Sequence, residues 1–111
     1  MREHLLFLDD IIEAISRVET YSKGLSRARL EKNAMAHDAI IRNLEIIGEA
    51  VKNIPPETKK NNPQIEWKKI AGLRDILAHE YFGVDVDVVW DIIENKIPVL
   101  KSQILLLMKH K

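Results

Sequence analysis

The sequence predicts an all-α protein, an antiparallel bundle of four to five helices. Apolar residues recur every three to four positions over long segments, which is the helical pattern. Glycine and proline are scarce, at four each, and most of them fall between these segments. No segment shows sustained strand alternation, and the nearest to it, GVDVDVV, is short. Short links between the expected helices favour antiparallel neighbours.

The composition fits one domain over residues 1–111. Hydrophobic residues make up 46% of the chain and the formal net charge is zero, so bulk charge gives no sign of nucleic-acid binding. A local patch would have to supply it, and the candidates are Lys59, Lys60, Lys68 and Lys69. The absence of cysteine excludes disulfides and thiolate sites and fits a cytoplasmic location. No apolar run approaches the roughly 18–20 residues of a membrane span, so we expect no membrane association.

The first helix is expected over residues 3–22, with Gly24 as its C-cap. Residues 26–32 form either a short separate turn or the first part of the next helix. That second helix is expected over residues 33–53, because the two prolines in IPPE cannot continue it. Its core stripe consists of Ala36, Ile40, Leu44, Ile47 and Val51.

The third helix is expected over residues 65–79, and the stretch NNPQ before it is a loop. Its core face consists of Ile70, Leu73 and Leu77. Asp85 or Asp87 is expected to cap a fourth helix. Because Pro98 falls inside the apolar periodicity of that helix, we expect a kink or a break there before the helical pattern resumes.

The third helix also carries the polar stretch RDILAHEYF. At about 100° per residue, Asp75 and His79 are neighbours opposite the core face, so Asp75 can orient the imidazole. Arg74 lies at the core edge, about 140° from His79, so their convergence needs a curled arginine, a loosened helix or a second chain. On spacing alone, Asp75 and His79 are an ordinary surface pair, and Tyr81 is a packing residue with its hydroxyl in water.

The non-core side of the second helix carries charged residues near one line: Arg42, Glu45 and Glu49. They are either a solvated charge ladder or residues that support a site or an interface. Apolar residues lie alongside them: Met35, Ile41 and Ile46. These exceed what a surface helix needs, and a homodimer interface is the economical explanation. On the third helix, close helix approach is allowed by Ala71, Gly72 and Ala78.

Several stretches resemble one known family. RDILAHEY matches the R-x4-H-x-Y signature of HepT-like proteins in the HEPN superfamily. IIRNLEIIGEAVKNIP before it and VDVVWDII after it agree with the same family, and the resemblance extends to about residue 104. It implies a HEPN-like helical bundle that forms a homodimer, with the sites at or near the dimer cleft.

The resemblance also implies an activity, that of a metal-independent endoribonuclease that needs no cofactor. Such proteins are commonly the toxin of a type VII-like toxin–antitoxin pair, whose antitoxin is an MNT-type nucleotidyltransferase that transfers AMP to the tyrosine of the motif. Carried over, Arg74 and His79 are the catalytic pair, Asp75 supports them, and Tyr81 is the AMP acceptor. This is chemically consistent, because RNA supplies its own 2′-hydroxyl nucleophile. The protein then needs proton transfer, which suits His79, and phosphate binding, which suits Arg74.

Two other interpretations stay open. The chain is a non-catalytic helical partner that docks a nucleotidyltransferase or presents its substrate, or it is a structural dimer without a site. An RNA cleavage assay on purified, unmodified protein separates the enzyme from both.

Overall fold

The computed structural model describes residues 2–79 and 86–109, without the side chains of residues 2–5, 76, 78 and 79. Every regular element in these residues is helical, which confirms the all-α fold class. The longer helices are α1 (Arg2–Ser22), α3 (Ala34–Lys52), α5 (Trp67–His79) and α7 (Ile97–Lys109). The shorter elements are α2 (Arg27–Glu31), α4 (Pro56–Asn61), α6 (Val86–Asp91) and a π-helical turn, η1 (Ile92–Lys96).

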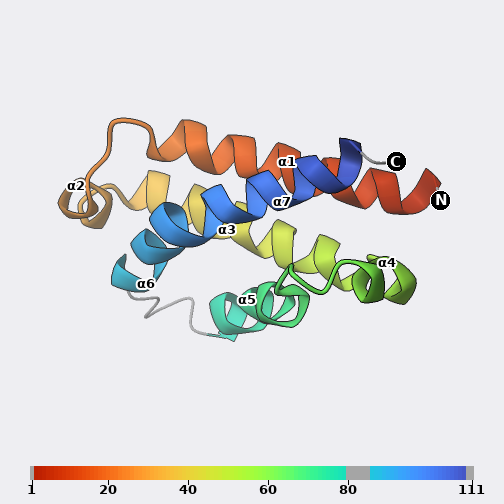
Figure 1. The fold of residues 1–111 in the computed structure, drawn as a ribbon. Helices are drawn as coiled ribbons and strands as arrows, with labels where there is room; N and C mark the ends of the chain where they lie inside the picture. Colours follow the sequence, from red (N-terminus) through yellow and green to blue (C-terminus); the bar gives the residue numbers. More distant parts are fainter. Residues whose placement is uncertain (1, 80–85, 110–111) are drawn as a thin grey trace.

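The long helices form an antiparallel bundle of 42 × 27 × 21 Å (Figure 1). Helix α3 lies at its centre and packs against α1 on one side and α5 on the other. Helix α7 lies along α1, while α5 packs mainly against α3. The short helices α2 and α6 contact each other at the far end of the bundle, away from both chain termini. In the described residues, no helix is both long and apolar enough to cross a membrane.

The core lies between α1, α3 and α7. Four of the five residues predicted for the stripe of α3 are fully buried: Ile40, Leu44, Ile47 and Val51. They pack with fully buried residues of α1, which include Leu8, Ile11, Ile15 and Val18. The fifth, Ala36, is half-buried. The core face predicted for α5 is less complete, because Leu77 is fully buried but Ile70 and Leu73 are half-buried.

The helix boundaries follow local signals that the sequence shows. Helix α1 ends two residues before Gly24, whose φ of 77° is in the left-handed region that glycine adopts without strain. Helix α3 begins after Asn33, whose side chain accepts a hydrogen bond from the backbone N–H of Ala36 at 3.0 Å. Of the two alternatives for residues 26–32, the structure has the separate short helix α2, capped by Ser26.

Two local predictions need correction. The two prolines do end α3, but the second of them, Pro56, begins the short helix α4. Proline suits the first position of a helix because its nitrogen needs no partner there. Asp87 is not a cap, because it lies inside α6 and forms an ion pair with Arg27 of α2. The alternative cap, Asp85, lies outside the described residues.

We expected a kink or a break at Pro98; the structure has a π-helical turn just before it, and the helix continues through the proline without a break. The turn, η1, comes directly before α7, and Pro98 is the second residue of α7. At its end the backbone N–H of Ile97 bonds to the carbonyl of Ile92, five residues back. A proline nitrogen cannot donate to the preceding turn, and its ring crowds the carbonyl four residues back. Widening the turn before Pro98 accommodates the proline while the helix continues.

Candidate active site

The polar motif lies on α5, and the loop before α5 is anchored. Trp67, the first residue of α5, is buried, and its indole Nε1 donates a hydrogen bond to the carbonyl of Asn62 at 2.9 Å. Further along, Leu77 is fully buried, while Arg74 and Asp75 are exposed. Helix α5 therefore presents two charged residues of the motif to solvent from a backbone that is fixed at its start.

Gly48 lets the backbone of Arg74 lie directly against α3. A Cβ added at Gly48 would be 2.9 Å from the Cβ of Arg74 and 3.0 Å from its backbone nitrogen, closer than packed atoms approach. Gly48 was not among the predicted residues, although a glycine inside an apolar helical pattern is a signal of close packing. Gly72, which we expected to allow close approach, meets nothing within 4 Å in the described part of the chain.

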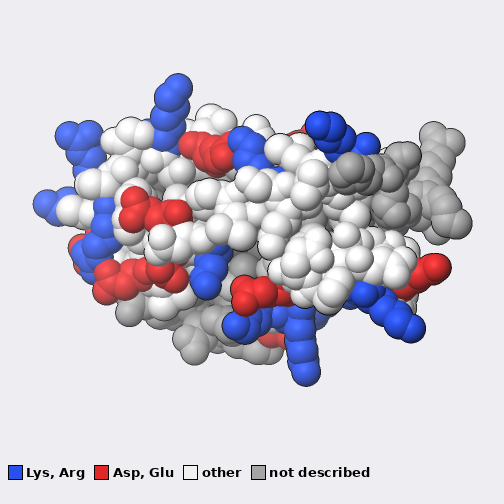
Figure 2. Space-filling view, in the orientation of Figure 1, with Lys and Arg blue, Asp and Glu red and all other residues white. Residues whose placement is uncertain are grey.

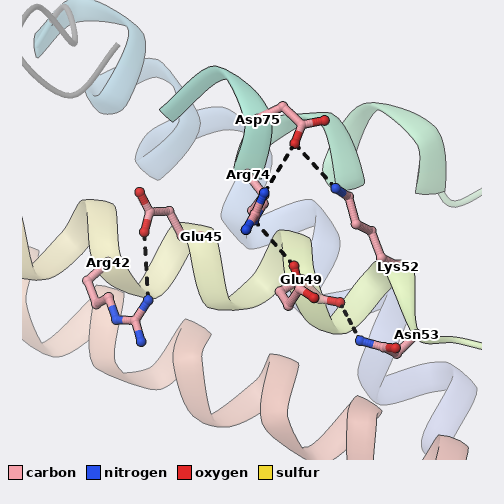
Figure 3. Close-up of polar contacts among 7 residues, drawn as sticks. All are labelled: Arg42, Glu45, Glu49, Lys52, Asn53, Arg74 and Asp75. Carbon is pink, nitrogen blue, oxygen red and sulfur yellow. Dashed lines mark hydrogen bonds and ion pairs between the residues drawn. The ribbon is translucent and has the colours of Figure 1, made fainter. Parts of the chain in front are cut away.

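Four charged side chains join α3 and α5 beside this contact (Figure 3). Nε of Arg74 lies 3.3 Å from Oε1 of Glu49, and Nη1 of Arg74 lies 3.6 Å from Oδ1 of Asp75. The same Asp75 oxygen accepts a hydrogen bond from Nζ of Lys52 at 3.3 Å. The guanidinium of Arg74 is thus held on two of its nitrogens. Nη2 has no partner among the described residues.

The environment of Asp75 favours its charged form. The hydrogen bond from Lys52 is the main cause that lowers the pKa of Asp75 below its usual 3.8, and the charge of Arg74 adds to it. Asp75 is therefore a carboxylate at neutral pH. Our prediction that Asp75 orients His79 stays a prediction, because the side chain of His79 and the whole of Tyr81 lie outside the described residues. The predicted convergence of Arg74 and His79 stays a prediction for the same reason.

Arg74 lies at the edge of a groove of about 310 Å³, which we call the Arg74 groove. Its lining comes from three helices: Phe7 and Asp10 of α1; Arg42, Glu45, Ile46, Glu49 and Ala50 of α3, with Asn53 just after its end; and Arg74 of α5. The structure therefore brings the three charged residues predicted on the outer side of α3 together with Arg74. Within the groove, Nη1 of Arg42 lies 3.8 Å from Oε1 of Glu45. Sequence reasoning missed the residues that α1 contributes.

Charge is mixed over the surface. Figure 2 shows basic and acidic side chains interspersed on the face that it presents, in keeping with a net charge of zero. The lysines proposed as a local patch come from two places, Lys59 and Lys60 in α4 and Lys68 and Lys69 at the start of α5. In the described residues, no three His, Asp or Glu side chains gather as they do around a metal ion.

Comparison with known proteins gives a consistent result. The model of the HepT-like family, described as "Ribonuclease HepT-like", matches residues 11–107. A protein of Thermococcus cleftensis named "Probable ribonuclease HepT" is 43% identical over 102 residues, which cover 92% of this chain and 93% of that protein. A protein of Caldanaerobacter subterraneus subsp. tengcongensis named "Putative RNase" is 41% identical over 98 residues, which cover 88% of each chain.

A further relative is longer than this chain. A protein of Methanocaldococcus jannaschii named "Gamma-glutamylcyclotransferase and putative RNase" is 40% identical over 105 residues, which cover 95% of this chain. The match covers 47% of that protein, so this chain spans about half of its length. No solved structure matches the chain.

Proposed function

Because the chain belongs to the HepT-like ribonuclease family, we propose that it is a metal-independent endoribonuclease that cleaves RNA in the cytoplasm. The main support for the proposal is that Arg74 is both paired with neighbouring carboxylates and exposed to solvent. Its Nε and Nη1 atoms form ion pairs with Glu49 and Asp75, at 3.3 and 3.6 Å, yet the side chain is 46% exposed and lines a groove. An arginine that is already oriented loses little freedom when it binds a planar pair of phosphate oxygens.

In the proposed reaction the 2′-hydroxyl of RNA attacks the adjacent phosphorus, and the bond to the 5′-oxygen of the next nucleotide breaks. His79 takes the proton from the 2′-hydroxyl or gives one to the leaving oxygen, because imidazole titrates near neutral pH. Arg74 stabilises the charge that develops on the phosphorane oxygens. The products are a 2′,3′-cyclic phosphate and a 5′-hydroxyl. Asp75 orients His79, and it also forms ion pairs with Lys52 and Arg74.

The biological setting that we propose is a toxin–antitoxin pair. The chain acts as the toxin, as a homodimer whose cleft contains the sites, and an MNT-type nucleotidyltransferase is the antitoxin. Transfer of AMP to the hydroxyl of Tyr81 adds a phosphate group two residues from His79. That negative charge would compete with RNA for Arg74 and block the cleft. The modification therefore switches the ribonuclease off.

The test is RNA cleavage by purified protein whose Tyr81 is shown to be unmodified by mass spectrometry, with a chelator present. We expect Arg74→Ala and His79→Ala each to lower kcat by at least about 100-fold, the usual cost of removing a group that stabilises the transition state. Arg17→Ala is the matched control. Arg17 is equally exposed, at 45%, and pairs with Glu13 at 3.1 Å far from the motif, so its loss should leave the rate unchanged.

Three outcomes separate the interpretations. Cleavage by Arg74→Ala at the rate of the unmodified parent would contradict the proposed role of Arg74. Cleavage that stops with the chelator and returns with added metal would contradict metal independence. A parent protein that binds a nucleotidyltransferase but leaves RNA intact would favour the non-catalytic partner instead.

A further inference from the structure

The Arg74 groove extends beyond the place where a phosphate would contact Arg74. Its floor is the outer side of α3, and its walls are α1, through Phe7 and Asp10, and α5, through Arg74. In Figure 3, Arg42, Glu45, Glu49 and Asn53 follow one another along α3, with Arg74 above Glu49. A phosphate that contacts Arg74 therefore has the groove beside it, and the nucleoside attached to that phosphate is the group that can enter.

The polar lining of the groove suits hydrogen-bond donors. Asp10 forms no ion pair or hydrogen bond with any described residue, so its carboxylate is available. The amide nitrogen of Asn53 already donates to the carbonyl of Glu49 at 3.0 Å, which leaves its Oδ1 as an acceptor. Among the described residues, Glu45 pairs only with Arg42, at the long distance of 3.8 Å. Carboxylates repel a second phosphate, whereas they accept hydrogen bonds from the exocyclic amino groups of bases.

The apolar lining suits a flat ring. Phe7 and Ile46 are half-buried, so each packs against the core and still contributes surface to the groove. Proteins hold unpaired RNA bases by placing them against aromatic and apolar side chains and by bonding their polar edges. A groove of about 310 Å³ in which α1 and α3 each contribute an apolar side chain and a hydrogen-bond acceptor combines both features.

We propose that the Arg74 groove binds the base next to the cleaved phosphate and selects bases that carry an exocyclic amino group, namely cytosine, adenine or guanine, over uracil. Phe7 and Ile46 contact the ring, and Asp10, Glu45 and Asn53 accept from the amino group. Uracil presents carbonyl oxygens where these bases present an amino group, and those oxygens face carboxylates. The inference rests on the proposed ribonuclease function, and it makes Phe7 and Asp10 specificity residues.

The first test compares cleavage of oligocytidylate, oligoadenylate and oligouridylate by the intact chain. We expect kcat/KM to be about tenfold higher for the first two than for oligouridylate, the scale of one well-formed base contact. Asp10→Asn should reduce that preference several-fold, because the amide also donates to uracil. Asp9→Asn is the matched control, since Asp9 is the exposed neighbour on α1 that does not line the groove.

Phe7→Ala should raise KM for oligocytidylate about tenfold with little change in kcat, as expected when a base loses its apolar contact. Because Phe7 also packs against the core, Phe7→Leu is made in parallel, and thermal unfolding shows which variants stay folded. Leu6→Ala is the control, because Leu6 is exposed and lies outside the groove. Equal kcat/KM for all three RNAs, or a preference that Asp10→Asn leaves unchanged, would overturn the inference and leave the ribonuclease function intact.

A second measurement does not depend on cleavage. Binding of 5′-CMP and 5′-UMP to the unmodified protein is followed by titration calorimetry, and CMP should bind more tightly, with the difference lost in Asp10→Asn. If the parent protein leaves RNA intact but shows this difference, the groove is a base site and the ribonuclease function fails. Equal binding overturns the inference. Light scattering gives the remaining outcome: a dimer that Phe7→Leu and Asp10→Asn dissociate would mean that a second copy covers the groove.

Discussion

Helix α3 meets α1 through large side chains, whereas at Gly48 it meets the backbone of α5. On the α1 side, fully buried aliphatic residues such as Ile15 and Leu44 fill the interface. On the α5 side, Gly48 leaves no side chain between the helices, and the backbone of Arg74 takes that space. Beyond the contact, Arg74 forms its pair with Glu49 at the exposed edge.

The two interfaces serve different purposes. Each buried aliphatic side chain stabilises the fold by roughly 1.5–3 kcal/mol, so the interface of α1 with α3 accounts for much of the stability. Exposed ion pairs contribute little stability in water. The pairs that Arg74 forms with Glu49 and Asp75 are therefore better explained as positioning the guanidinium. Changes on the α1 side should affect folding, and changes on the α5 side should affect activity first.

The largest effect on stability is expected for Leu44→Ala. Leu44 is fully buried, and truncating such a leucine costs about 2–5 kcal/mol because a cavity replaces the lost contacts. Urea unfolding followed by circular dichroism measures the change. Met35→Ala on the same helix is the control, since Met35 is 82% exposed and its loss should change the free energy of unfolding by less than about 0.5 kcal/mol. Similar losses in both variants would contradict the assigned core.

Gly48→Ala tests the close approach of α3 and α5. The added Cβ meets Arg74 at 2.9 Å, so the two helices must separate, and overpacking of this kind costs about 1–3 kcal/mol. Part of that cost is offset by the helix propensity of alanine, about 1 kcal/mol. The larger consequence is expected for catalysis. A displacement of the Arg74 guanidinium by about 1 Å should lower kcat roughly 10- to 100-fold.

Gly72→Ala is the matched control for that variant. It makes the same substitution in α5 at a glycine whose added Cβ meets nothing within 4 Å. It should stabilise the protein slightly through helix propensity and leave RNA cleavage unchanged. Equal activity in Gly48→Ala and Gly72→Ala would show that the position of Arg74 does not depend on the glycine contact. If the parent protein forms the proposed homodimer and Gly72→Ala alone loses it, Gly72 would lie at the contact between chains.

The sequence predicted those features of the helices that depend on residues close to one another along the chain. Gly24 at the end of the first helix and the irregularity next to Pro98 both arise within one or two helical turns. The cap that Asn33 forms is equally local, although it was not predicted. Helix α4 was missed for a local reason as well, since a proline that ends one helix is also well suited to begin the next. The burial of the α3 stripe followed from periodicity, because that stripe faces α1.

The candidate site was predicted only in part, because periodicity says which face a residue occupies but not which helix that face meets. Arg74 and Asp75 were assigned from the motif. The hydrogen bond from Lys52 to Asp75 joins residues 23 positions apart, and no spacing rule connects them. Phe7 and Asp10 reach the Arg74 groove from α1, far from the motif in sequence. Such contacts between helices appear only once the bundle is assembled.

The smallest effect is expected for the pH dependence of stability in Asp75→Asn. Lys52, and then Arg74, lower the pKa of Asp75 in the folded protein below 3.8. The folded state therefore favours the carboxylate more than the unfolded state does. This stabilisation is present above about pH 3.8 and is lost as the pH falls through the lower pKa of the folded state. Melting temperatures of the parent and Asp75→Asn should thus differ at pH 6 and converge towards pH 2.5.

Subtracting the two curves isolates Asp75, because other carboxylates with a lowered pKa, such as Asp87 beside Arg27, are present in both proteins. When Lys52 is also replaced by Met, the difference in melting temperature between the proteins with Asp and with Asn at position 75 should shrink. Lys52 is the larger cause of the lowered pKa of Asp75. Parallel curves at all pH values would mean that the ion pairs between α3 and α5 do not persist in solution. In that case α5 would be held by the Gly48 contact and by its apolar side chains, such as Trp67 and Leu77, and Arg74 would be oriented only when RNA binds.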